Sequence, residues 1–135
     1  MTHATQTIRA EEDKLGVPHH LVSVQGTGYT SKIDFWSTSP LTIDNVIYEV
    51  HGYPPPVDSY TYANIPVILG EYGSLTDSDS FYADVEAKKI PNLAWDFEPY
   101  SNCAPDLVSV TYDATMLDAS AWGTTVQTYL LAHAH

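Results

Sequence analysis

The sequence predicts an α/β fold, and within that class half of a closed barrel of parallel strands. Four short apolar segments rich in β-branched residues alternate with segments of helical spacing, which is typical of parallel βαβ units. The chain has 135 residues, whereas a barrel of eight strand–helix units needs roughly 250. A helix is expected before the first strand, as when such a barrel is divided just after a strand. We therefore predict a partial (half) TIM barrel of about four parallel strands with intervening helices, in a single domain over residues 1–135.

The elements are expected in a simple order along the chain. They are a helix over 2–15, a strand over 21–25, a loop over 29–41 with at most a turn or two of helix, a strand over 45–51, a brief helix within 57–64, a strand over 66–71, a helix over 80–89, a strand over 92–96, a long loop over 97–113 and a helix over 119–132. The first helix ends at Gly16, and Pro18 cannot continue it.

Spacing and capping residues justify the helices. One face of the first helix is expected to be apolar, with a single glutamate out of character: Ala4, Ile8, Glu11 and Leu15. The helix over 80–89 is expected to start at Asp79 or Ser80, because these side chains accept hydrogen bonds from exposed N–H groups. One face of the last helix is expected to carry Trp122, Val126, Tyr129, Leu130 and His133.

Composition excludes several classes of protein. The formal net charge is -12 with only five Lys and Arg, which argues against nucleic acid or an anionic membrane as partner and suits a neutral or cationic one. Cys103 is the single cysteine, so neither an internal disulfide nor a cysteine-based metal cluster is expected. No glycine-rich phosphate loop follows a predicted strand, and we expect no cofactor or metal. The sequence has no apolar run of membrane-spanning length and, at its N-terminus, no hydrophobic core of a signal peptide.

Three predicted strand ends carry side chains suited to chemistry. These are His51 with Tyr53, then Glu71 flanked by Gly70 and Gly73, then Trp95 with Asp96. Neighbouring parallel strands bring such groups to one rim, where catalytic residues of strand–helix barrels lie. His and Tyr can orient a carboxylate by hydrogen bonding, and Trp offers a flat face to a sugar ring. Each residue can also be explained without a function. Glu71 could belong to an ion pair at the strand end, His51 could be a structural histidine, and Trp95 could be a core residue.

The segments NVIYEVHGY, IPVILGEYG and NLAWDFEPYSNCAPDLV, followed by Trp122-Gly123, resemble the C-terminal half of glycoside hydrolase family 5, the cellulase-like family. The resemblance runs from about residue 4 to the end. It implies strands five to eight of a (β/α)₈ barrel, preceded by the fourth helix, in a retaining enzyme acting on β-linked glucans or mannans, with endoglucanase-like action on β-1,4-glucan as the expected activity. It also implies an extracellular protein.

The resemblance implies roles for individual residues. Glu71 matches the nucleophile, and His51 and Tyr53 match the His-x-Tyr pair of strand six. Trp95 matches the stacking tryptophan of strand eight. Aromatic rings stack on sugars, so the expected substrate contacts are Trp95, Trp36, Tyr72 and Tyr100.

One catalytic group of that family is missing. Its acid/base glutamate follows an asparagine at the end of strand four, which lies before Met1, and no Asn-Glu dipeptide occurs in this chain. Three readings stay open. The chain is one part of an enzyme closed by a companion N-terminal half or a second copy, a glycan-binding remnant, or a half-barrel that only oligomerises. In a two-copy barrel, Asp96 would be the carboxylate nearest the vacant position, although strand alternation points it away from the face of Trp95.

Overall fold

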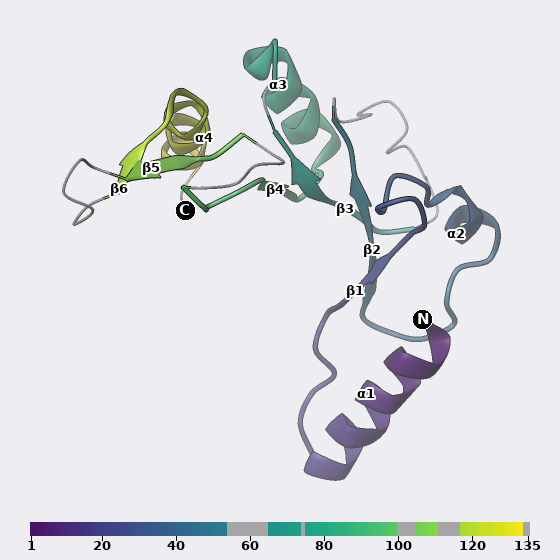
Figure 1. Cartoon of the computed structure of the whole chain (residues 1–135). Coiled ribbons are helices and arrows are strands. Elements are labelled where there is room, and N and C mark those ends of the chain that lie inside the picture. The colour runs from purple at the N-terminus through teal and green to yellow at the C-terminus, as the bar shows by residue number, and fades with distance from the viewer. Residues whose placement is uncertain (54–64, 74, 100–104, 111–116, 134–135) are drawn as a thin grey trace. The chain divides into compact units, whose positions relative to one another are not determined.

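The computed structural model describes residues 1–53, 65–73, 75–99, 105–110 and 117–133 (Figure 1). The chain divides into two compact units. Residues 1–51 and 58–68 form the first, and residues 52–57 and 69–135 form the second.

Among its described residues, the first unit contains two complete parallel strands and two helices. Its elements are α1 (Thr2–Leu15), β1 (Val22–Gln25), α2 (Asp34–Thr38) and β2 (Val46–His51). β1 pairs with β2 in parallel, with Val24 opposite Tyr48 and Gln25 opposite Glu49. Both strands, the first helix and the short helix in the 29–41 loop are as predicted. The brief helix expected within 57–64 lies outside the described residues.

The second unit holds the end of β3 (Val67–Tyr72) and the rest of the chain. Its further elements are α3 (Ser78–Lys88), β4 (Asn92–Ala94), β5 (Val108–Val110), β6 (Leu117–Ala119) and α4 (Ala121–Ala132). β3 pairs with β4 in parallel, and strands β1 to β4 follow one another in a four-stranded sheet. The predicted α/β class with four parallel strands is therefore confirmed.

Two details of the second unit differ from the prediction. The segment predicted as a long loop over 97–113 contains β5, which pairs with β6 in an antiparallel hairpin. Three-residue strands are too short to give a clear alternation of polar and apolar residues, so sequence patterns miss them. The N-cap of α3 is Asp77, whose side chain accepts from the N–H of Ser80, and not Asp79 or Ser80.

The predicted apolar face of α1 is wrong. Ile8 and Leu15 are 41% and 71% exposed, and the buried residues of α1 are instead Thr5, Arg9 and Glu12. Arg9 explains the reversal. Its guanidinium lies 2.6 Å from the Glu12 carboxylate and donates at 2.9 Å to the carbonyl of Asp44, in the loop before β2. A polar network, and not an apolar stripe, therefore attaches α1 to its unit.

His19 extends this network. Its Nδ1 lies 2.8 Å from the carboxylate of Asp44, and its Nε2 lies 3.0 Å from the carboxylate of Asp13. Each ring nitrogen needs a proton to donate to a carboxylate, so the bridge is complete only when the ring is protonated. The hydrogen bonds to Asp44 and Asp13 raise the pKa of His19 above its ordinary value of 6.5.

We expect this bridge to stabilise the first unit in a pH-dependent way. Folding raises the pKa of His19, so the stabilisation is fully present below the unfolded value and is lost as the pH rises through the folded value. His19→Gln should therefore lower the free energy of unfolding at about pH 6 and have a smaller effect at about pH 8. Chemical unfolding of both proteins across this range measures the difference. His3→Gln, on the exposed side of α1, is the matched control, and a His19→Gln effect independent of pH would contradict the expectation.

The core of the second unit is aromatic. Leu69, Tyr72 and Val85 are essentially buried. The Tyr72 ring contacts Phe81 at 4.7 Å and Trp122 at 6.0 Å between centroids, so α3 and the start of α4 cover the same residue of β3. No described helix has the length and apolar character needed to cross a membrane.

Candidate active site

Glu71 and Tyr53 are hydrogen-bonded in the second unit. The Tyr53 hydroxyl donates to Oε1 of Glu71 at 2.9 Å, and the N–H of Gly52 donates to the Glu71 carbonyl at 3.2 Å. The register of β3 against β4 shifts between Leu69 and Tyr72. These two residues are both buried, while Glu71 between them is only half-buried. The expected hydrogen bond between Glu71 and Tyr53 is confirmed.

Tyr53 keeps its proton near neutral pH and so acts as the donor of this pair. Partial burial raises the pKa of Tyr53, and so do the hydrogen bond to Glu71 and the negative charges of Glu71 and Asp96. A phenol that stays protonated can only orient the carboxylate by donating to it. The structure thus fixes one oxygen of Glu71 at the end of β3.

Three hydrogen bonds hold the backbone of Trp95 and Asp96. Trp95 N–H donates to the Tyr72 carbonyl at 2.8 Å, and the Trp95 carbonyl accepts from the indole of Trp122 at 3.1 Å. The carbonyl of Asp96 accepts from the N–H of Leu107 at 2.9 Å. The peptide bond between Trp95 and Asp96 is cis. The Trp95 side chain is 41% exposed whereas Asp96 is only 6% exposed, so one residue offers a ring surface and the next a buried carboxylate.

His51 lies in the first unit and is held by Glu49. Its Nε2 lies 2.6 Å from Oε1 of Glu49, while Ser23 donates to Oε2 at 2.6 Å. Gln25 donates to Oε1 at 3.2 Å. Burial acts to raise the pKa of Glu49, but the hydrogen bonds from Ser23, His51 and Gln25 outweigh it and the pKa is lowered.

Sequence reasoning missed Glu49. Residues 49 and 51 share one face of β2 by strand alternation, which was the available signal. An ionised Glu49 can only accept, so Nε2 of His51 carries the proton of this hydrogen bond. Because His51 and Glu71 belong to different units, their expected proximity stays a prediction.

Two predicted substrate contacts are corrected. Tyr72 is 1% exposed, and its hydroxyl donates to the side-chain oxygen of Asn92 at 2.7 Å. Trp36 is 9% exposed, with its ring 5.3 Å from that of Tyr48. Both are core residues in this structure, because each ring packs against another aromatic ring, Tyr72 on Phe81 and Trp36 on Tyr48. Tyr100, the remaining candidate, lies outside the described residues.

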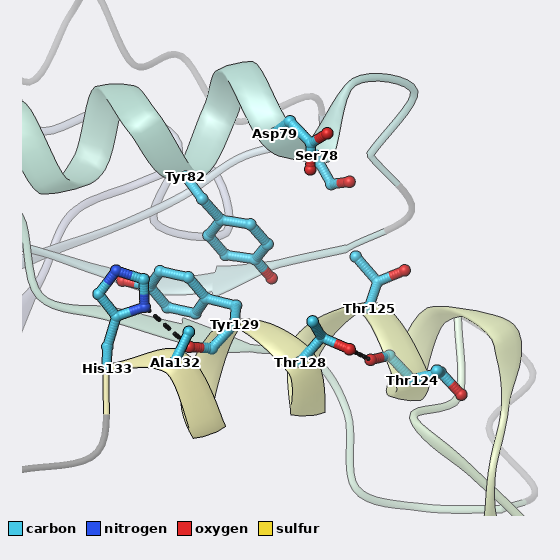
Figure 2. Close-up of a pocket in the computed structure, with 9 residues that line it drawn as sticks. All are labelled: Ser78, Asp79, Tyr82, Thr124, Thr125, Thr128, Tyr129, Ala132 and His133. Atoms are coloured by element: carbon cyan, nitrogen blue, oxygen red, sulfur yellow. Dashed lines mark hydrogen bonds between the residues drawn. The ribbon is translucent and has the colours of Figure 1, made fainter.

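A groove of about 440 Å³ lies between α3 and α4 in the second unit, as Figure 2 shows. On its wall the rings of Tyr82 and Tyr129 stack at 3.9 Å. Hydroxyls of Thr124 and Thr128 also line it, and each donates to the carbonyl four residues earlier in its own helix. None of the residues at the Tyr53–Glu71 pair lines this groove. Among the described residues, no group of three acidic, histidine or cysteine side chains could hold a metal ion.

No family model matches the chain, and no curated protein sequence matches it. Solved structures do. A β-mannanase from Streptomyces thermolilacinus, solved with mannohexaose, has a TM-score of 0.67 at 19% identity, over 93% of this chain and 46% of that one. The mannohexaose complex of Thermomonospora fusca β-mannanase has a TM-score of 0.66 at 20% identity, over 90% of this chain and 44% of the mannanase.

A β-glucanase from Saccharophagus degradans, solved with cellotetraose, has a TM-score of 0.62 at 17% identity, covering 82% of this chain and 41% of the glucanase. A family 5 cellulase from an Icelandic hot spring isolate is also similar. The chain spans less than half the length of the three described first. The chain therefore has the fold of part of a TIM barrel, similar to less than half of each of these glycoside hydrolase structures.

Proposed function

We propose that the chain is the nucleophile-bearing half of a retaining β-glycosidase that acts on β-1,4-linked glucan or a related polysaccharide. The observation that supports this most is the hydrogen bond from Tyr53 to Glu71 at the end of β3. Carboxylates at strand ends of such barrels are positioned for catalysis. The fold neighbours include mannanases and a glucanase solved with oligosaccharides, which favours a glycan as ligand.

In this proposal the carboxylate of Glu71 attacks the anomeric carbon and forms a glycosyl-enzyme intermediate, while the bond from that carbon to the leaving-group oxygen breaks and the leaving group departs. Tyr53 fixes its orientation, and the exposed ring of Trp95 stacks against a sugar. By resemblance we also propose His51 as a catalytic residue, with its ring oriented by Glu49. The direct test is the release of phenol from an activated aryl β-cellobioside, since this leaving group departs with little help from a general acid.

We propose that the general acid comes from outside these 135 residues. Retaining hydrolysis needs two carboxyl groups about 5–5.5 Å apart, and the Asn-Glu pair expected to supply the acid is absent from the sequence. We propose that a companion N-terminal half or a second copy closes the barrel and supplies it. Export from the cell is proposed by resemblance alone.

The alternative function is a non-catalytic half-barrel that binds glycans or only oligomerises. The exposed Trp95 supports glycan binding as well as it supports catalysis. The phenol release experiment separates the two, because a binding module retains the sugar without breaking the aryl glycoside.

We expect the chain to associate. Strands at both ends of an open parallel sheet present unpaired backbone groups, which favour pairing with another chain. Light scattering should give about 30 kDa for a dimer, twice the 14.9 kDa of the chain. A compact 14.9 kDa monomer, with amides of β1 and β4 protected from exchange, would contradict this expectation.

A further inference from the structure

A second groove of the second unit is almost entirely apolar. It has a volume of about 520 Å³ and is lined by α4 and the β5–β6 hairpin, which are neighbours in Figure 1. Two of its lining residues, Val108 and Val126, are buried. Four large apolar side chains that line it are each at least half exposed: Phe97, Leu117, Leu130 and Leu131. Exposed apolar groups gathered in this way mark an interaction surface, which we call the hairpin groove.

The first unit carries an exposed apolar stripe. Its members are Met1, Ala4, Ile8 and Leu15, which are all exposed. Their intervals of three, four and seven residues place them on one face of α1. The polar contacts of Arg9 attach α1 to its unit through another face, so the stripe itself is left to solvent. Helices with such a stripe bind to apolar grooves of partner proteins through side chains at these intervals.

The strand order relates the stripe to the groove. β1 and β4 are the two edge strands of the sheet, α1 comes directly before β1 in the chain, and the residues of the hairpin groove come after β4. Unpaired edge strands favour pairing with another chain. When β4 of one copy pairs with β1 of another, the segment that follows the first strand meets the segment that precedes the second. Edge pairing between two copies therefore brings a stripe to a groove.

The length of the chain favours a second copy as the partner. The chain spans less than half of the mannanases that it resembles, so two copies together have about the length of one closed barrel. A two-fold axis makes the contact twice, because each copy then gives its stripe and receives its partner's stripe. Both exposed apolar surfaces of both copies are covered in this arrangement.

We propose that the hairpin groove is a docking site for α1 of a second copy of this chain, with Ile8 and Leu15 as the side chains that insert into it. This deepens the proposed function and rests on its barrel closure, since it names the partner that closes the barrel as a second copy. The contact itself requires no catalysis, so it is tested without a substrate.

The experiment measures the dissociation constant of the dimer by sedimentation and light scattering of the full chain over a range of concentrations. Ile8→Glu alters the stripe and Leu130→Lys alters the groove. The matched controls are Gln6→Glu, on a different exposed part of α1, and Ala132→Lys, at an exposed residue of α4 that does not line the hairpin groove. Thermal unfolding followed by circular dichroism shows that each variant is folded.

We expect Ile8→Glu and Leu130→Lys each to weaken dimerisation at least about a hundredfold. Each loses the burial of one apolar side chain, and the loss occurs at both contacts of the dimer. The controls should change the dissociation constant by no more than about twofold. Ile8→Ser and Leu130→Ser, which add no charge, repeat the measurement should a charged variant unfold, and they should also weaken the dimer.

Mixing the two charged variants tests the pairing itself. A heterodimer of Ile8→Glu with Leu130→Lys has one unaltered contact and one contact that joins opposite charges. We expect the mixture to form a dimer at concentrations where each variant alone is monomeric. A mixture that stays monomeric would show that the stripe and the groove do not meet.

The remaining outcomes separate this inference from the proposed function. A wild-type chain that is monomeric at every concentration overturns the inference and leaves a companion half as the occupant of the groove, while phenol release would still support the proposed function. If only one of the two surfaces affects the dimer, or neither does, α1 does not dock in the groove. A dimer that both Ile8→Glu and Leu130→Lys weaken, but that releases no phenol, supports the docking site and contradicts the proposed function.

Discussion

Replacing Glu71 with glutamine should abolish the burst of phenol that we expect the chain to release from an activated aryl β-cellobioside. The amide keeps the shape of the side chain and its contact with Tyr53 but cannot attack the anomeric carbon. Loss of a nucleophile typically lowers the rate by at least about a thousandfold. Stopped-flow absorbance of released phenol, scaled to protein concentration, measures the effect.

Glu11→Gln, which removes an exposed carboxylate from α1, is the matched control and should leave the burst unchanged. Tyr53→Phe tests the orienting hydrogen bond and should slow the burst without removing it. Sustained turnover of unactivated cellulose by the purified chain would contradict the proposal, because that reaction requires a general acid at a specific distance from Glu71. A misplacement of about 1 Å can already reduce the rate about a hundredfold.

The sequence was sufficient for the fold class and for the Tyr53–Glu71 pair. The apolar run before Gly70 identifies a buried strand, and a carboxylate at its end is informative because it is expensive to bury without a purpose. Strand ends of parallel neighbours meet at one edge, so Tyr53 and Glu71 could be paired without a structure. These inferences depend on the spacing of apolar residues and on the order of the strands along the chain, and both can be read from the sequence.

The features that the sequence did not predict depend on contacts between residues far apart in the chain. Nothing in the spacing of α1 reveals that Arg9 reaches the carbonyl of Asp44, so the buried face was assigned to the apolar residues and not to the polar ones. Tyr72 is adjacent to Glu71 in the chain, but its side chain is 1% exposed and its ring lies 4.7 Å from that of Phe81. The partner of an acid is likewise a property of side chains brought together by the fold.

Close packing at Gly123 contributes to the stability of the second unit and also positions Trp122, which supports Trp95 at the candidate site. The first turn of α4 lies directly on the backbone before β5, where the Ser120 N–H donates to the carbonyl of Leu107 at 3.0 Å. A Cβ at Gly123 would lie 1.7 Å from that same carbonyl oxygen. Backbone atoms cannot move aside as a flexible side chain can, so the helix itself would have to shift. Trp122 would shift with it, and its indole holds the carbonyl of Trp95.

We therefore expect Gly123→Ala to lower the free energy of unfolding by about 3 kcal/mol or more and to disturb Trp95. Urea unfolding followed by tryptophan fluorescence measures both, since Trp95 and Trp122 lie at the affected contact. Gly16→Ala is the control for backbone strain. Gly16 has a φ of 66° and nothing within 4 Å of an added Cβ, so only the left-handed conformation is penalised, by about 1 kcal/mol. Equal losses for the two variants would mean that α4 is not packed on Leu107, and the support of Trp95 by Trp122 would then have to be abandoned as well.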